Sequence, residues 1–365
     1  MNITGYFDEV KDFRVVGRCS HLLSDILGLV LIGSLADCND YSEIADYGND
    51  NEEELKAKLG FIFPEGIPSE DTLDRVIRHL NSASLEVSFK SCLEDLSLIG
   101  RHICIDGKAL RGTIPKGKQK ALVQMVNVWV DELGLSFGQA QIEKKSNEIV
   151  AIPQLLDQID CEGSVITIDA IACQKEIVKK IIGKKADYII ALKANQKNLY
   201  EAVVNFMESR LDSCDQHKSV DIGHGRGEER RVYSTNKIDL IDQLDEWKRV
   251  QSIVMIERTR YLADGKKEYK RQYFISSLSD ASAEQFGEYL RGHWAIENRL
   301  HWQLDFTFRE DASRVRKDKG PANLHFIRKW VLFLLKKNPE KISIKRKRKK
   351  AGRSIDYIID LFHNA

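Results

Sequence analysis

The sequence lacks a net charge of any size. Its 56 lysine and arginine residues are balanced by 55 aspartate and glutamate residues, which leaves a formal charge of +1. Attraction of the whole molecule to a polyanion is therefore excluded, and any contact with nucleic acid must depend on a local group of cations. The clearest such group is a run of six cations from Lys345 to Lys350. We expect this run to be a flexible segment that binds phosphate groups without sequence preference.

The sequence also lacks paired cysteines and long apolar runs. Its seven cysteines are scattered and never form a C-x-x-C pair, which argues against a disulfide framework and a zinc ribbon and favours a reducing cytoplasm. The first residues have no basic stretch leading into an apolar one, so no signal peptide is expected. The most apolar run, residues 26–36, is far shorter than the roughly 20 residues of a membrane span. It predicts a buried helix, and no membrane partner is expected.

Residues 1–98 are predicted to form a helical domain. Residues 21–35 carry apolar side chains on one helical face, and residues 41–47 and 84–98 repeat this pattern more weakly. Ser69 follows a loop that contains glycine and proline, and its side chain is of the type that caps a helix.

Residues 99–340 are predicted to form an α/β domain. Strand-like segments alternate with helical ones from residue 102 onwards: strands at 102–106, 123–130, 135–142, 164–169 and 186–192, and helices at 152–158 and 174–183. A meander followed by strand–helix–strand units indicates a mixed five-stranded sheet covered by helices. Strand character at about 200–278 then indicates a β-rich insertion, a helix follows at 283–304, and residues 341–365 form a basic C-terminal tail.

Two aspartates follow buried strands of this sheet. Asp106 ends the segment HICID, and Asp169 ends SVITID. Open α/β sheets build their sites at the carboxyl edge of the strands, so two neighbouring strands would bring these carboxylates together. Such a pair is costly unless it is protonated or bridged by cations, and oxygen ligands favour Mg²⁺ or Mn²⁺. For each aspartate alone, a turn or helix-capping role is the competing interpretation.

A third candidate lies on the predicted helix at 283–304. Steps of four residues place His293, Glu297, His301 and Asp305 in one polar stripe. Glu297 can complete a carboxylate triad with the two aspartates. Alternatively, the two histidines and Glu297 bind Zn²⁺, although the helical zinc signature His-Glu-x-x-His is missing. A salt-bridged helix without catalytic function is the third interpretation.

Several motifs together resemble the H-repeat-associated family of insertion-sequence DDE transposases. They are IDGKALRG (105–112), KSNEI-x-AIP-x-LLD (145–157), TIDA-x-x-CQKEI (167–177), DYIIALKANQ (187–196), HGR-x-E-x-R (224–230) and HW-x-IEN-x-LHW-x-LD-x-x-F-x-ED (293–311). The N-terminal motifs HLLSDIL and GIPSEDTLDRV resemble the helical domain associated with such catalytic domains. The resemblance covers most of the chain.

The resemblance implies a function and a set of site residues. Asp106, Asp169 and Glu297 would be the DDE triad of a ribonuclease-H-like domain and would hold two divalent ions, Mg²⁺ or Mn²⁺. The reaction would be DNA hydrolysis and strand transfer in a bacterial cytoplasm, in association with the nucleoid. The partners would be the terminal inverted repeats of the element and a target DNA, and a homodimer on DNA is left open.

The same comparison suggests DNA-contacting residues, most of them basic. They are Lys108, Arg111, Lys193, Asn195, Gln196, Arg226, Arg230, Arg291, His293 and His301, with Arg231 beside them on the insertion. The chain departs from related transposases around the glutamate, because Tyr289 and Arg291 precede it at altered spacing and Leu304 stands where a lysine is usual. Two alternatives remain open: a catalytically silent, domesticated DNA-binding protein, and a metal-dependent nuclease without strand transfer.

Overall fold

The computed structural model describes residues 1–15, 17–91, 93, 97–142, 148–223, 226–262 and 265–364. Residues 145–147 of the KSNEI motif, His224, and the end of the helix predicted at 84–98 fall partly or wholly outside these ranges. Within them, no helix combines the length and the apolar character that crossing a bilayer requires.

The chain begins with a layer of helices, as predicted. They are α1 (Leu23–Leu35), α2 (Tyr41–Asp50), α3 (Glu52–Leu59), α4 (Glu70–His79) and α5 (Ser82–Ser91). Ser69 caps α4 by accepting a hydrogen bond from the backbone N–H of Thr72. Nearly every residue of α1 is buried, which explains why its sequence is apolar on all sides rather than on one stripe.

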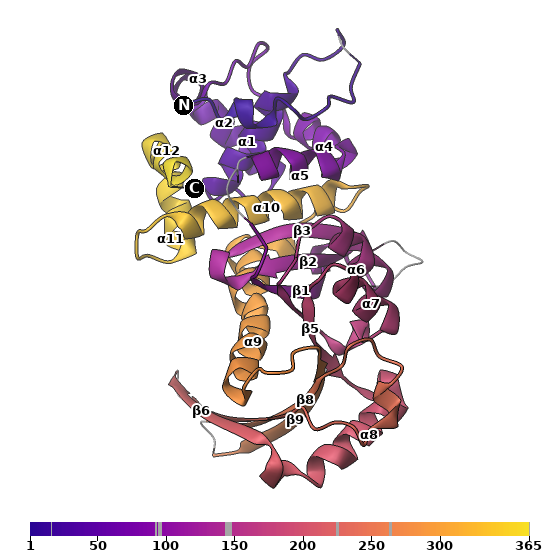
Figure 1. Cartoon of the computed structure of the whole chain (residues 1–365). Helices are drawn as coiled ribbons and strands as arrows, with labels where there is room; N and C mark the ends of the chain where they lie inside the picture. Colours follow the sequence, from indigo (N-terminus) through magenta and orange to yellow (C-terminus); the bar gives the residue numbers. More distant parts are fainter. Residues whose placement is uncertain are drawn as a thin grey trace.

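A nine-stranded sheet forms the centre of the molecule (Figure 1). Its strands, in chain order, are β1 (His102–Ala109), β2 (Gln124–Val130), β3 (Leu135–Ile142), β4 (Val165–Ile168), β5 (Asp187–Leu192), β6 (Asp215–Gly223), β7 (Arg226–Thr235), β8 (Ser252–Tyr261) and β9 (Lys267–Ser276). In space the order is β3-β2-β1-β4-β5-β9-β8-β7-β6. The first five are the predicted mixed sheet, since β2 runs antiparallel to β1 and β3, whereas β4 and β5 run parallel to β1. This strand order and these directions are those expected of the ribonuclease-H-like domain that the resemblance implies.

The predicted β-rich insertion does not form a separate sheet. It begins with α8 (Lys197–Glu208), and its four strands extend the central sheet because β9 pairs antiparallel with β5. Figure 1 shows these strands curving away from β1–β3 toward the far end of the molecule. The sheet is therefore continuous from β1–β5 to the insertion.

Helices cover both faces of the sheet. On one face, α6 (Glu148–Asp157) and α7 (Lys175–Gly183) pack with α8 over residues such as Ile103 and Ile166. On the other face, α9 (Ala283–Ile296) packs over Val165 and Ile189. Because successive side chains of a strand point to opposite faces, His102 and Cys104 share the α9 side of β1 with Asp106.

The helix that carries Glu297 changes its winding at that residue. α9 continues into two π-helical turns, η8 (Glu297–His301) and η9 (Gln303–Thr307). Next, α10 (Gly320–Lys337) lies between the N-terminal helices and strands β1–β3 (Figure 1). It shares one apolar core with α1 and with Trp129 of β2. π-helical turns of this kind are rare and frequently occur at functional sites.

The prediction of a flexible basic tail is wrong. Residues 341–365 contain α11 (Ile344–Ala351) and α12 (Ile355–His363), which pack on α10. The Arg348 guanidinium is buried and donates to the carbonyl oxygens of Ser34 and Cys38 at the end of α1. Lys347 donates in the same way to Leu335 and Asn338 at the end of α10. The last carbonyls of a helix have no partner within it, so buried cations that donate to them stabilise both ends.

This arrangement predicts that the buried Arg348 of the run is needed for folding, whereas the exposed Arg346 is not. Arg348→Ala leaves several buried carbonyls without a donor, so we expect it to lower the free energy of unfolding by about 2–4 kcal/mol in urea denaturation. Arg346, on the same helix, is exposed. Arg346→Ala is the matched control and should change stability by less than about 0.5 kcal/mol. Equal effects of the two substitutions would contradict this assignment.

Candidate active site

Asp106 and Asp169 lie side by side at the middle of the sheet. β1 and β4 are parallel and their ladder ends with Ile105 opposite Ile168, so the next residue of each strand is an aspartate. Asp106 lies within β1 rather than at its end, because β1 stays paired with β2 as far as Ala109. Asp169 precedes a short 3₁₀ turn, but its side chain makes no capping hydrogen bond there. The capping interpretation of Asp169 therefore has no support.

The carboxylates around Asp106 repel one another. Burial, together with the negative charge of Asp169, raises the pKa of Asp106 to about 7, and Glu148 and Glu297 add to this rise. The part of this shift that comes from Asp169, Glu148 and Glu297 shows that acidic groups converge on Asp106. Asp106 is half-buried, whereas Asp169 and Glu297 are exposed to solvent. The site is thus an acidic surface with one carboxylate set deeper than the others.

Glu148 is a fourth carboxylate that the sequence analysis did not single out. α6 begins at Glu148 rather than at Ile152, so Pro153 lies inside the helix and not in its first turn. The Glu148 carboxylate lies against Gly107, where an added Cβ atom would collide with its Oε1 atom. Burial and the charge of Asp169 raise the pKa of Glu148. Two features of the sequence could have indicated Glu148: the glycine directly after Asp106, and the glutamate within the KSNEI motif.

The helix that carries Glu297 crosses the two aspartate strands. His293 is buried and its Nδ1 atom lies 3.0 Å from Oγ1 of Thr167, two residues before Asp169. His301 Nδ1 lies 3.5 Å from Oδ2 of Asp106. Glu297 stands between these two contacts, and its charge acts on Asp106. The helix is therefore fixed against β4 on one side of Glu297 and against β1 on the other.

Both histidines are neutral in this environment. Burial lowers the pKa of His293, and burial together with the nearby charge of Lys108 lowers the pKa of His301 to about 3. Their imidazoles are already engaged with Thr167 and Asp106. The zinc interpretation gains no support, because among the described residues no three His, Cys, Asp or Glu side chains are arranged to hold a metal ion; the burial of His293 argues against its predicted DNA contact. His301 is also largely shielded from solvent.

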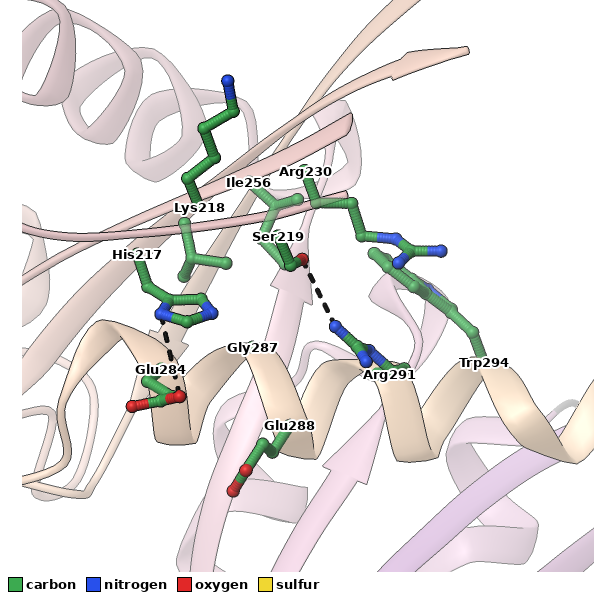
Figure 2. A pocket seen from close by; sticks show the side chains of 11 residues that line it. His217, Lys218, Ser219, Arg230, Ile256, Glu284, Gly287, Glu288, Arg291 and Trp294 are labelled. Carbon is green, nitrogen blue, oxygen red and sulfur yellow. Dashed lines mark hydrogen bonds and ion pairs between the residues drawn. The ribbon is translucent and has the colours of Figure 1, made fainter. Parts of the chain in front are cut away.

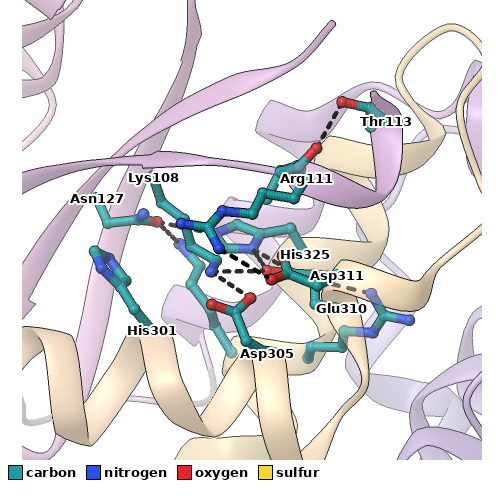
Figure 3. Close-up of polar contacts among 12 residues, drawn as sticks. Lys108, Arg111, Thr113, Asn127, His301, Asp305, Glu310, Asp311 and His325 are labelled. Atoms are coloured by element: carbon teal, nitrogen blue, oxygen red, sulfur yellow. Dashed lines mark hydrogen bonds and ion pairs between the residues drawn. The ribbon is translucent and has the colours of Figure 1, made fainter. Parts of the chain in front are cut away.

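A polar network surrounds Lys108, which lies two residues after Asp106 on β1 (Figure 3). Lys108 Nζ is 2.5 Å from Oδ1 of Asp305, the last member of the predicted polar stripe, and 3.8 Å from Oε2 of Glu310. Glu310 in turn contacts the His325 Nδ1 atom at 2.9 Å. Burial alone would raise the pKa of Glu310, but the charges of His325, Arg328 and Lys108 lower it to about 2. Lys108 is itself buried, so the predicted phosphate contact is not supported by its position.

The network connects to the aspartate strand from the other side as well. Asn127 is the β2 residue opposite Asp106. Its Oδ1 atom lies 3.1 Å from His325 Nε2 and accepts a hydrogen bond from Lys329 Nζ at 3.1 Å. α10, which carries His325 and Lys329, is thereby joined through β2 to the strand that holds Asp106. Side chains on three elements thus fix the position of β1 relative to the Glu297 helix.

Two of the predicted DNA contacts support the loop after Asp169 instead. Asn195 Nδ2 donates to the carbonyl of Ala170 at 2.7 Å, and Gln196 Nε2 donates to that of Cys173 at 2.9 Å. Both residues come from the turn that follows β5. Lys193 beside them is exposed, and so is Arg111, which lies 3.9 Å from a carboxylate oxygen of Asp311.

Two of the predicted DNA contacts, Arg230 on the insertion and Arg291 on α9, line one cavity (Figure 2). It has a volume of about 360 Å³ and lies between α9 and strands β6–β8. Arg291 points from α9 to the strand side and donates to the Ser219 hydroxyl at 3.2 Å. Arg230 lies 2.7 Å from Glu228 and also pairs with Asp221. Arg231 pairs with Glu229, and Arg226 opens β7, where only its backbone is described.

The carboxylate oxygens of Asp106, Asp169 and Glu297 are donors of the kind that bind a hard divalent cation. Their side chains are not arranged as a complete set of ligands. Within the described ranges, no three His, Cys, Asp or Glu side chains are arranged as a metal site. Oxygen donors suit Mg²⁺ and Mn²⁺. The raised pKa of Asp106 shows a surplus of negative charge that such a cation would offset.

Comparison with known proteins gives concordant matches. Residues 98–334 match the family described as transposase DDE domain, and residues 4–92 match the family described as DDE_Tnp_1-associated. The chain is 37% identical over 366 residues to YncI of Escherichia coli O157:H7, a protein named as a candidate transposase, and the match covers 98% of this chain and 93% of YncI. It is 32% identical to the H repeat-associated protein YhhI of Escherichia coli K12, with 96% and 94% of the two chains covered.

A more distant similarity links the chain to a solved structure. It is the piggyBac transposase synaptic complex with hairpin DNA, to which this chain is 11% identical with a TM-score of 0.47. The match covers 96% of this chain and 75% of that one. At this level of similarity no detail of the site can be carried across.

The buried network generates a stability prediction. Lys108→Met leaves the Asp305 carboxylate without its partner and should lower the free energy of unfolding by about 3–5 kcal/mol. Adding Asp305→Leu removes the uncompensated charge, so the double variant should regain most of the loss. A double-mutant cycle in urea denaturation measures the coupling. Simple additivity of the two single substitutions would show that the pair is not coupled.

Proposed function

The chain belongs to the DDE transposase family, and from this premise we propose that it cuts and joins DNA strands with Asp106, Asp169 and Glu297 as its catalytic triad. The observation that carries the proposal is the register of β1 and β4. It sets two aspartates next to each other, and the helix bearing Glu297 is fixed against both strands. The biological role that we propose is transposition of an insertion sequence between its terminal inverted repeats and a target DNA.

The triad would hold two divalent ions, Mg²⁺ or Mn²⁺. When bound, such ions activate water or a DNA 3′-hydroxyl and stabilise the leaving 3′-oxygen during in-line attack on phosphorus. Glu148 lies close enough to influence the same charge balance, since Asp169 raises its pKa. We propose it as a fourth carboxylate of the site.

The chain's own residues would keep the triad in position. The neutral His301 imidazole lies against Asp106, and the contact of His293 with Thr167 anchors the helix at the other strand. Groups that orient metal-binding side chains in this way are commonly needed for full activity. Asn195 and Gln196 hold the loop after Asp169 by its carbonyls. The exposed cations Lys193 and Arg111, and Arg291 beside the cavity, are the DNA contacts that the geometry leaves available.

The triad predicts metal-dependent cleavage of DNA. Purified protein with Mg²⁺ or Mn²⁺ should nick DNA that bears the candidate terminal repeats. Asp169→Asn and Glu297→Gln should each lower the nicking rate by roughly 10²–10³-fold, because each removes several kcal/mol of transition-state stabilisation. Glu201→Gln, an exposed position on α8, is the matched control and should leave the rate unchanged.

The same assay separates the alternatives. DNA binding by the wild-type chain without metal-dependent cleavage would contradict the enzyme and indicate a silent DNA-binding protein. Cleavage without joining of the cut end to a target would indicate a nuclease. Joining that is lost in both triad variants supports the transposase.

Asn195 offers a separate prediction, because its geometry indicates support of the Asp169 loop and the sequence pattern indicates a DNA contact. We expect Asn195→Ala to lower the cleavage rate about tenfold or more through misplacement of Asp169, with little change in the DNA dissociation constant. Lys193→Ala should do the opposite and weaken binding with a smaller salt dependence. A loss of affinity in Asn195→Ala that equals its loss of rate would assign it to DNA binding.

A further inference from the structure

Two large aromatic side chains lie exposed on the helix that continues from Glu297. Trp302 is 49% exposed and Phe306 is 59% exposed. Their rings are stacked on each other, with centroids 4.7 Å apart and an angle of 14° between the planes. The stacked pair therefore presents aromatic surface to solvent without a covering element in the described part of the chain.

The aromatic pair lies about one turn beyond the triad glutamate. In the π-helical turn η8, the backbone N–H of Trp302 donates to the carbonyl oxygen of Glu297. Both side chains are exposed, whereas Leu300, which precedes them, and Leu304, which lies between them, are buried. The π-helical winding thus hydrogen-bonds the backbone of Trp302 to Glu297 itself, one turn away on the same helix. A regular α-helix would hydrogen-bond residue 302 to residue 298 instead.

Helix α11 supplies positive charge at the same place. Arg348 donates to the carbonyl of Thr307 and so holds α11 against the turn that carries Phe306. Lys345 Nζ lies 5.8 Å from the centre of the Phe306 ring. Arg346 and Lys349 are exposed as well. None of these three pairs with a carboxylate within the described ranges, whereas Lys350 is paired with Glu340.

We propose that Trp302, Phe306 and the outward cations of α11 form a stacking platform for the bases of single-stranded DNA next to the triad. This platform consists of Trp302, Phe306, Lys345, Arg346 and Lys349. Aromatic faces bind unpaired bases of any sequence, and neighbouring cations bind the phosphates between them. The bases of a duplex are already stacked on one another, so their faces are closed to such a surface. The proposal rests on the proposed function, because cutting beside Glu297 creates strand ends there whose terminal bases can unpair.

The charge around the aromatic pair distinguishes this occupant from a second protein chain. An apolar protein surface would gain nothing from the unpaired Lys345 beside the rings and two further cations on the same helix, and bringing cations together from two copies is unfavourable. A polyanion with aromatic rings satisfies both parts of the platform. Single-stranded DNA is the polymer with this chemistry that the proposed reaction produces.

The test measures binding of labelled oligonucleotides to the full chain in EDTA, where no cleavage occurs. Trp302→Ala should weaken binding of a single-stranded oligothymidine about tenfold and should change binding of a duplex of equal length less than twofold. Trp302→Phe should retain most of the affinity. Lys349→Ala should reduce the slope of log affinity against log salt by roughly 0.7 for the single strand.

The control is Phe13→Ala, which removes a ring that is 47% exposed in the N-terminal part of the chain. It should alter neither affinity. Equal loss of single-strand and duplex binding in Trp302→Ala, or no loss at all, would overturn the platform. A change from dimer to monomer in Trp302→Ala with unchanged DNA affinity would show that a second copy covers the surface instead.

The two proposals fail in different assays. Oligonucleotide binding in EDTA does not require an active triad, and the nicking test of Asp169→Asn does not require Trp302. Metal-dependent nicking together with Trp302-independent binding would refute the platform alone. Platform-dependent binding without any nicking by the wild-type chain would refute the enzyme alone.

Discussion

The pairing of β1 with β4 brings two carboxylates to adjacent positions, and the surrounding structure holds them there against their mutual repulsion. With Glu148 and Glu297 close by, the site carries an excess of negative charge, which is visible in the raised pKa of Asp106. The fixed positions of β1 and the Glu297 helix oppose this repulsion. His301 contacts Asp106 directly, and the ion pair of Lys108 with Asp305 joins the same strand to the same helix further along. A strand and a helix connected at two points cannot move apart without exposing or separating buried charges.

The polar stripe on this helix illustrates how one sequence pattern serves two functions. His293, His301 and Asp305 point toward the sheet and contact Thr167, Asp106 and Lys108, in that order. These contacts anchor the helix, and only Glu297 is left exposed beside the aspartates. The π-helical turns begin at this residue, so the helix changes its winding where the exposed carboxylate leaves the packed face. Spacing in the sequence showed that the four residues share one side of a helix, but it could not show which of them meets the sheet.

Local pattern was sufficient to predict the strands, their mixed order and the acidic residues at two of them, because buried strands and turn residues are short-range signals. Contacts between distant segments were not predictable in this way. The joining of the insertion to the main sheet depends on the pairing of β5 with β9, about 80 residues apart. The start of α6 was set too late, and Glu148 was missed with it. The basic run was mistaken for a solvated tail, because the carbonyls that bury Arg348 belong to α1, more than 300 residues away in sequence.

These buried cations also change the meaning of a net charge near zero. Several cations are buried inside the fold, where they pair with carboxylates or donate hydrogen bonds to carbonyl oxygens; they are Lys108, Lys347, Arg348 and Arg328. The counts of basic and acidic residues are therefore a poor guide to the charge that a partner meets. Among the many cations that stay outward are Lys193 after β5, Arg111 after β1, and Lys345 on α11 beside the exposed aromatic pair. Since Coulomb attraction between exposed charges is screened within about 10 Å at moderate salt, such placement matters more than the total. A chain with little overall attraction to nucleic acid would then hold DNA through local groups of exposed cations, and those nearest the carboxylates would couple affinity to chemistry at one place.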